Sequence, residues 1–145
     1  MTVEEALIRW RIHLASPPAK VYEAIATGPG RRRFWAESAD ERDGVIDFRF
    51  PNGASLSSRV LEAVPPRRFV LEYFGGSRDT FECADDGKGG ADLTLTDDGV
   101  PQEWHSETAA GWVSVLMSLK AAVDFDVDLR HHDAQRTWDH GYVDN

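Results

Sequence analysis

From residue 8 to residue 14 every second side chain is hydrophobic, and the side chains between them are Arg or His. A period of two is typical of a β-strand with one buried face. Ser16-Pro17-Pro18 ends this strand, because proline cannot donate a hydrogen bond to a neighbouring strand. Ser16 as N-cap and Pro17 at the first helical position predict a short helix, which Gly28-Pro29-Gly30 is expected to end. A second short helix is expected around residues 30–36.

Residues 44–97 read as a series of about six strands joined by short turns. Pro51-Asn52-Gly53, Pro65-Pro66, Gly75-Gly76 and Asp85–Gly90 mark the turns. Between them the hydrophobic residues again alternate with polar ones, which predicts an antiparallel sheet with one apolar face and one solvated face.

The period changes after residue 103. Trp112, Leu116, Leu119 and Val123 follow one another at helical spacing, and no proline interrupts residues 103–124. This pattern predicts a long amphipathic helix that packs on the apolar face of the sheet. The predicted fold class is therefore α+β: a curved antiparallel sheet wrapped around a long C-terminal helix, with two short helices after the first strand. We expect a single domain over residues 1–145, with a core of about 3–124 and a tail of 125–145.

Charge and composition narrow the class of partner. The chain of 145 residues contains 25 Asp and Glu against 16 Lys and Arg, a net charge of −9, which argues against a nucleic-acid partner. The three consecutive arginines at 31–33 are expected to lie on a solvated helix face. No apolar run is long enough to span a bilayer and no signal peptide is evident, so we expect a cytoplasmic protein with no membrane insertion.

Motifs for known catalytic chemistry are missing. The sequence has no nucleophile elbow and no phosphate-binding glycine loop, so we predict no cofactor and assign no catalytic residue. Cys83 shares strand parity with Phe81 and is expected to be a buried, unreactive thiol. The tail residues His131, His132, Asp133 and His140 do not have the spacing of a zinc site, and we predict no metal.

Several motifs along the chain resemble the START-like (SRPBCC) superfamily, and within it the C-terminal domain of the heat-shock protein 90 ATPase activator and its bacterial single-domain relatives. They are the opening strand, Pro17-Pro18-x-x-Val21-Tyr22-x-Ala24-Ile25, Arg33-Phe34-Trp35, Val60–Val70, Gly89–Thr96, Gly99-Val100-Pro101 and Gly111-Trp112-x-x-x-Leu116-x-x-Leu119-Lys120. The match spans roughly residues 7–123. The resemblance implies a helix-grip fold with a cavity between sheet and long helix, which other members use for lipids, polyketides and similar apolar molecules, some of them as cyclases.

The cavity implied by this resemblance gives the site prediction. Side chains that face inward by strand parity, or that approach from helices, are expected to line it: Trp35, Phe48, Phe50, Leu71, Tyr73, Phe81, Trp104, His105, Trp112 and Leu116. The alternative is that these residues fill a dry core. The expected partner is a small hydrophobic molecule of lipid or polyketide type.

Three functions stay open at this point: ligand binding, a cyclase- or hydrolase-type enzyme that uses His105 or an inward carboxylate, and a co-chaperone-like interaction module. The eukaryotic activator has an additional N-terminal domain that this sequence lacks, which weakens the chaperone alternative. In the tail, Trp138 and Tyr142 indicate either a segment that folds back on its own core or one that docks on a second copy in a homodimer.

Overall fold

A computed structural model describes residues 7–144 of the chain. Within these residues seven strands form one antiparallel sheet in the order β1-β7-β6-β5-β4-β3-β2. The strands are β1 (Leu7–Leu14), β2 (Ser38–Arg42), β3 (Val45–Arg49), β4 (Ser55–Val64), β5 (Arg68–Glu72), β6 (Arg78–Asp85) and β7 (Ala91–Asp98). The helices are α1 (Pro18–Ala26), α2 (Gly28–Arg32) and α3 (His105–Phe125), with short 3-10 turns η1 (Phe74–Gly76), η2 (Gln102–Trp104) and η3 (Trp138–His140).

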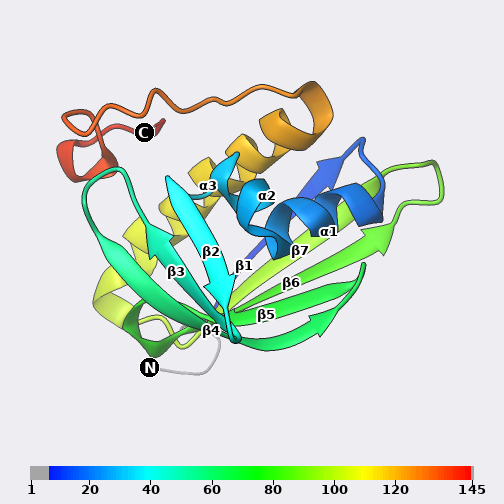
Figure 1. The fold of residues 1–145 in the computed structure, drawn as a ribbon, viewed down its shortest axis with the longest axis horizontal. Coiled ribbons are helices and arrows are strands. Elements are labelled where there is room, and N and C mark those ends of the chain that lie inside the picture. Colours follow the sequence, from blue (N-terminus) through cyan, green and yellow to red (C-terminus); the bar gives the residue numbers. More distant parts are fainter. Residues whose placement is uncertain (1–6, 145) are drawn as a thin grey trace.

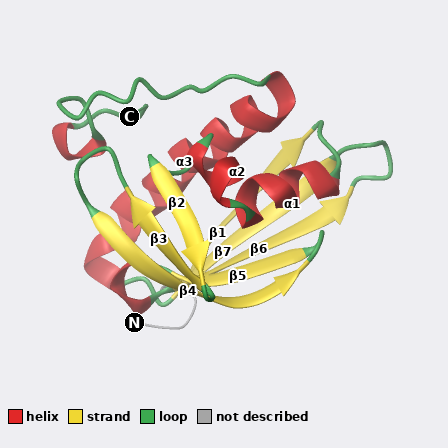
Figure 2. Ribbon diagram, in the orientation of Figure 1, coloured by secondary structure: helices red, strands yellow, loops and turns green. Residues whose placement is uncertain are grey.

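The sheet is curved, and the helices lie on one of its faces, with the chain after α3 running back toward the turn between β3 and β4 (Figure 1). Figure 2 shows the same division into one strand layer and one helical layer. The helical stripe predicted from the sequence is the buried side of α3, since Trp112, Leu116, Leu119 and Val123 are all at most 4% exposed. The predicted α+β helix-grip arrangement is confirmed.

The start of α1 differs from the prediction. Pro17 occupies the N-cap position and makes no side-chain cap. The hydroxyl of Ser16 instead donates to the carbonyl oxygen of Val123 at 2.8 Å, and Asp124 accepts hydrogen bonds from the backbone N–H groups of Ala15 and Ser16. The Ser-Pro-Pro segment therefore ties the end of β1 to the C-terminal end of α3.

Gly28-Pro29-Gly30 also behaves differently from the prediction: it opens α2 rather than ending α1. Thr27 caps this short helix, with its hydroxyl accepting from the N–H of Gly30 at 3.1 Å. Gly30 has no room for a side chain, because a Cβ there would lie 2.5 Å from the carbonyl oxygen of Ala24. The segment after α2 forms a strand, β2, that the sequence pattern did not predict.

Arg31 corrects the prediction of a solvated arginine face. Its side chain is fully buried, and its guanidinium donates to the carbonyl oxygens of Ala39 at 2.7 and 3.0 Å and of Ile25 at 3.1 Å. Burial lowers the pKa of Arg31 to about 10, partly offset by the charges of Glu41 and Asp40. Arg32 stays exposed, and Arg33 reaches the carbonyl oxygen of Ala122 on α3.

Candidate functional site

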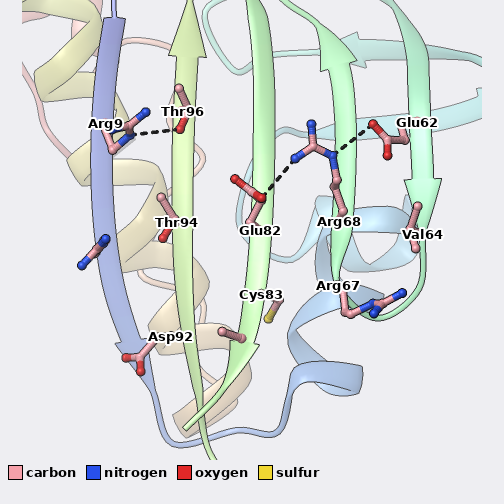
Figure 3. Close-up of a pocket in the computed structure, with 12 residues that line it drawn as sticks. Arg9, Glu62, Val64, Arg67, Arg68, Glu82, Cys83, Asp92, Thr94 and Thr96 are labelled. Atoms are coloured by element: carbon pink, nitrogen blue, oxygen red, sulfur yellow. Dashed lines mark hydrogen bonds and ion pairs between the residues drawn. The ribbon is translucent and has the colours of Figure 1, made fainter.

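The sheet carries one hollow on each face. The hollow on the outer face, with a volume of about 900 Å³, is lined by charged side chains of β1, β4, β5, β6 and β7 (Figure 3). Arg68 pairs there with Glu62 and Glu82 at 3.0 Å, and Arg9 donates to Thr96 at 3.4 Å. This hollow lies on the face of the sheet away from the helices.

The hollow on the inner face is an apolar cavity of about 640 Å³ between the sheet, η1, η2, α3 and the tail. Seven of its lining residues are aromatic: Phe50, Tyr73, Phe74, Trp104, Trp112, Trp138 and Tyr142. We call this space the inner cavity. Hydrophobic and aromatic walls with a few polar groups are the usual character of a small-molecule site.

A cluster of aromatic rings separates the inner cavity from the rest of the core. Trp35 lies at its centre, with its ring centroid 4.9 Å from Phe48, 5.4 Å from Phe81 and 5.8 Å from Trp112. Two indole N–H groups have polar partners: Trp35 donates to the hydroxyl of Tyr73 at 3.0 Å, and Trp112 donates to Oδ2 of Asp97 at 2.8 Å. These two hydrogen bonds fix the positions of Tyr73 and Trp112, which both line the inner cavity.

Two fully buried carboxyl groups lie behind this wall. Asp79 on β6 is paired with Asp97 on β7 in the sheet register, and both are 0% exposed. Neither carboxyl group forms an ion pair with a basic side chain within residues 7–144. The pKa of Asp79 is raised well above its usual value by burial, by the charge of Asp97 and by a hydrogen bond to it. Burial and the neighbouring carboxyl group of Asp97 therefore both favour the protonated form of Asp79.

The charges around the inner cavity all have one sign. Its ionisable acidic residues are Asp97 at the floor, Glu107 on α3 and Asp139 in η3, and none of its 21 lining residues is Lys, Arg or His. Burial is the main cause of the raised pKa of Tyr73, and the neighbouring carboxyl groups of Asp79 and Asp97 add to it. The cavity is therefore apolar, aromatic and negative.

The tail forms one side of the cavity. Trp138 packs against the core and its ring lies 6.3 Å from that of Phe50, while Asn52 in the β3–β4 turn donates to Asp139 at 2.9 Å. The hydroxyl of Ser114 on α3 donates to the carbonyl oxygen of Val143. The structure thus shows the tail folded back on its own core, the first of the two arrangements predicted for it.

Arg130 fixes the path of the tail between α3 and η3. Its side chain is 5% exposed, and it donates to the carbonyl oxygens of Ala36 and Arg32 and to the carboxylate of Asp128. Burial opposes ionisation of Asp128, but the hydrogen bonds from Arg130 and His132 outweigh it and lower its pKa to about 2. His132 also contacts Glu37, and hydrogen bonds with Asp128 and Glu37 raise the pKa of His132.

The predicted site residues fall into two groups. Four of them border the inner cavity: Phe50, Tyr73, Trp104 and Trp112. Five others lie in the packed core and do not border it: Trp35, Phe48, Leu71, Phe81 and Leu116. His105 lies at the start of α3, where its Nε2 is 3.2 Å from the carbonyl oxygen of Leu7, and it does not border the cavity either.

Sequence reasoning missed the polar floor and the cover of the cavity. Asp97 continues the inward parity of Ala91, Leu93 and Leu95, and Asp79 shares the inward parity of Phe81 and Cys83. That signal was available but was hidden by the acidic composition of the surrounding segment. Cys83 is buried as predicted, and burial raises its pKa to about 11. Within residues 7–144 no group of three or more His, Cys, Asp or Glu side chains is arranged to bind a metal ion, and no helix is both long and apolar enough to cross a bilayer.

The curved antiparallel sheet around a long C-terminal helix is a helix-grip fold. The family of activator of Hsp90 ATPase homolog 1-like proteins matches residues 15–124, and the chain belongs to this family. A search of curated proteins found no match. This family assignment agrees with the resemblance inferred from the sequence motifs.

Solved structures share the fold at low identity. The Aha1 dimer from Colwellia psychrerythraea is 21% identical with a TM-score of 0.74, over 82% of this chain and 96% of that one. CalU16 from Micromonospora echinospora is 22% identical with a TM-score of 0.67, over 83% of this chain and 77% of that one. DynU16, from the dynemicin biosynthetic locus, is 16% identical with a TM-score of 0.74, over 85% of this chain and 49% of that one.

Proposed function

We propose that the chain binds a small hydrophobic molecule in the inner cavity. The observation that carries this proposal is an apolar space of about 640 Å³ in which seven aromatic side chains face one another across sheet, helix and tail. A volume of this size is within the range of ligand sites in proteins. The sequence motifs resemble a superfamily in which other members bind lipids, polyketides and similar apolar molecules, and this resemblance supports the same class of ligand.

Gly111 on α3 offers a way to test the proposal. It borders the inner cavity, and a Cβ added there meets no atom within 4 Å. Gly111→Leu therefore adds volume to the cavity wall, and leucine is a better helix former than glycine by nearly 1 kcal/mol. Gly111→Ala is the matched control, because it brings most of the helix propensity with little of the volume.

The experiment titrates the full chain with diphenylhexatriene, a neutral hydrophobic dye whose fluorescence rises in apolar surroundings. We expect saturable binding of one dye per chain, a loss of affinity of at least about tenfold in Gly111→Leu, and near-normal binding in Gly111→Ala. No saturable binding by the wild-type chain would contradict the proposal. So would equal binding by all three proteins, because the dye would then lie elsewhere.

A second candidate function is a cyclase- or hydrolase-type enzyme acting in the same cavity. The observation that favours it is the buried Asp79–Asp97 pair, in which the raised pKa of Asp79 supplies a proton donor next to a carboxylate that borders the cavity. His105, the other candidate base, contacts β1 instead. If turnover of a bound substrate is found, it should fall in Asp97→Asn and persist in His105→Ala.

A chaperone partner and a homodimer are further proposals that rest on the comparisons. The family name refers to an activator of the Hsp90 ATPase, and the related structure from Colwellia psychrerythraea is described as a dimer. Light scattering of the purified chain tests the dimer. The rate of ATP hydrolysis by the Hsp90 chaperone, measured with and without this chain, tests the chaperone partner.

A further inference from the structure

The strongest clue to the kind of ligand is the charge of the inner cavity. Its lining contains three acidic residues, Asp97, Glu107 and Asp139, and no Lys, Arg or His. Within residues 7–144 neither Glu107 nor Asp139 forms an ion pair with a basic side chain, and the polar partner of Asp139 is the neutral amide of Asn52. Two of the acidic groups lie near the mouth, on α3 and η3, and the third lies at the floor.

Asp97 is the group that a ligand would meet at the floor. Its side chain is fully buried, Oδ2 accepts from Trp112 at 2.8 Å, and Oδ1 has no donor among the described protein groups. Within residues 7–144 no basic side chain pairs with Asp97 or with its neighbour Asp79, and a buried carboxylate without a counter-charge is costly.

The aromatic walls suit the same kind of ligand. Trp104, Trp112 and Tyr73 line the same space as Asp97, and Phe74 and Trp138 line it from η1 and the tail. Aromatic faces attract cations, and the attraction strengthens where water is excluded. A carboxylate ligand, in contrast, would bring a second negative charge beside Asp97 with no basic side chain to balance it.

From this complementarity we infer that the ligand of the inner cavity is a hydrophobic cation, an apolar molecule that carries a protonated amine, seated with the amine toward Asp97. This inference deepens the proposed function and rests on it. It replaces a general expectation of lipid- or polyketide-like molecules with a specific charge, and it disfavours fatty acids as ligands.

The test uses three probes that share one alkyl chain and differ only in the head group: decylammonium, decanol and decanoate. Each is titrated into the full wild-type chain below its micelle concentration by isothermal calorimetry. We expect decylammonium to bind about tenfold tighter than decanol, and decanoate to bind weakest. In Asp97→Asn the advantage of decylammonium over decanol should disappear, while decanol itself binds as before.

Asp98→Asn is the matched control. Asp98 is the next residue of β7 and lies on the outer face of the sheet, where it pairs with Arg78. The substitution is the same in kind, because it also replaces an aspartate of β7 by asparagine. It should keep the wild-type order of affinities, which separates the effect of Asp97 from the general attraction of an acidic protein for cations. Circular dichroism confirms that each variant is folded. If Asp97→Asn does not fold, the order of affinities of the three probes for the wild-type chain decides whether the inference stands.

The outcomes distinguish a failure of the hydrophobic-cation inference from a failure of the proposed ligand-binding function. Equal binding of decylammonium and decanol, or tightest binding of decanoate, overturns the inference and leaves the hydrophobic cavity in place. A preference for decylammonium that survives in folded Asp97→Asn also overturns it. If none of the three probes binds saturably to the wild-type chain, the proposed function fails, and the inference fails with it.

Discussion

The two faces of the β-sheet carry opposite kinds of hollow, and β7 contributes residues to both. On the outer face Arg68 bridges Glu62 and Glu82 in an open, solvated groove (Figure 3). On the inner face Asp97 and Asp79 are buried behind aromatic rings and face no basic side chain in the described chain. Neighbouring residues of one strand, such as Asp97 and Asp98, fall on different sides of this division.

The contrast shows that the effect of a charged residue on stability depends more on which face of the sheet it occupies than on how many charged residues that face carries. Exposed ion pairs on the outer face contribute little to stability, because water screens them and long side chains lose entropy when they pair. A single carboxylate on the inner face has no such screening, so its surroundings must be specific. The inner face is therefore where a substitution should change both stability and binding.

The largest effect is expected from Trp112→Ala. Trp112 is 2% exposed, contacts Trp35, Tyr73 and Phe81, and donates to Asp97. Its truncation opens a cavity and removes a hydrogen bond, and we expect a loss of about 3–5 kcal/mol in the free energy of unfolding. Urea unfolding measures it. On the outer face Arg68→Ala should cost far less, and equal losses in the two variants would contradict the comparison.

A smaller effect is expected from Arg130→Ala, which releases the cover of the inner cavity. The side chain is buried and its hydrogen bonds reach Ala36, Arg32 and Asp128, so we expect a loss of about 2 kcal/mol. Faster proteolysis after residue 126 and a red shift of tryptophan fluorescence, as Trp138 leaves the core, would accompany it. Arg136→Ala is the control, because Arg136 is exposed and pairs only with Asp133. Equal protease sensitivity of both variants would refute this role of Arg130.

The effect that depends most on pH is expected from Asp79→Asn. Because the pKa of Asp79 is raised in the folded chain, the folded state binds this proton more tightly than the unfolded state does. The contribution of Asp79 to stability is therefore complete at low pH and is lost as the pH rises through the folded pKa. Asparagine does not ionise, so the variant escapes this loss and should gain free energy of unfolding relative to wild type as the pH rises.

The measurement is urea unfolding of wild type and Asp79→Asn in parallel from pH 5 to pH 9. The difference between them should shift steadily in favour of the variant as the pH rises. Groups common to both proteins, such as Asp128 and His132, cancel in this difference. Asp98→Asn on the outer face should show no comparable trend, and a flat difference for Asp79→Asn would mean that its carboxyl group is not perturbed as described.

Much of the fold could be predicted from the sequence because alternation and helical spacing report which face of an element is buried. The stripe from Trp112 to Val123 and the inward residues of β5–β7 are examples. The same patterns could not separate a cavity wall from a packed core. Phe48 and Phe50 share one parity, yet Phe50 borders the inner cavity and Phe48 does not, because the tail from Trp138 onward covers only the end of the sheet where Phe50 lies.

Charged residues account for most of the errors. Asp79 and Asp97 follow inward parity, but a carboxylate in an acidic sequence is ordinarily read as solvated. Arg31 is expected in solvent because three adjacent arginines on a helix point in different directions. Its burial depends on the carbonyl oxygens of Ile25 in α1 and of Ala39, and Ala39 comes within reach only when β2 forms beside α2, a contact that no local pattern encodes.

The buried guanidinium of Arg31 has a consequence for how the molecule behaves in a crowded solution. β2 is the outermost strand of the sheet at one end, and such strands offer backbone groups on which another chain can add. Two N–H groups of Arg31 donate to the carbonyl oxygen of Ala39, the second residue of this short strand, and Asp40, Glu41 and Arg42 follow it. A side chain from the preceding helix thus stands where a second strand would have to bond, and protects the sheet from edge-to-edge aggregation.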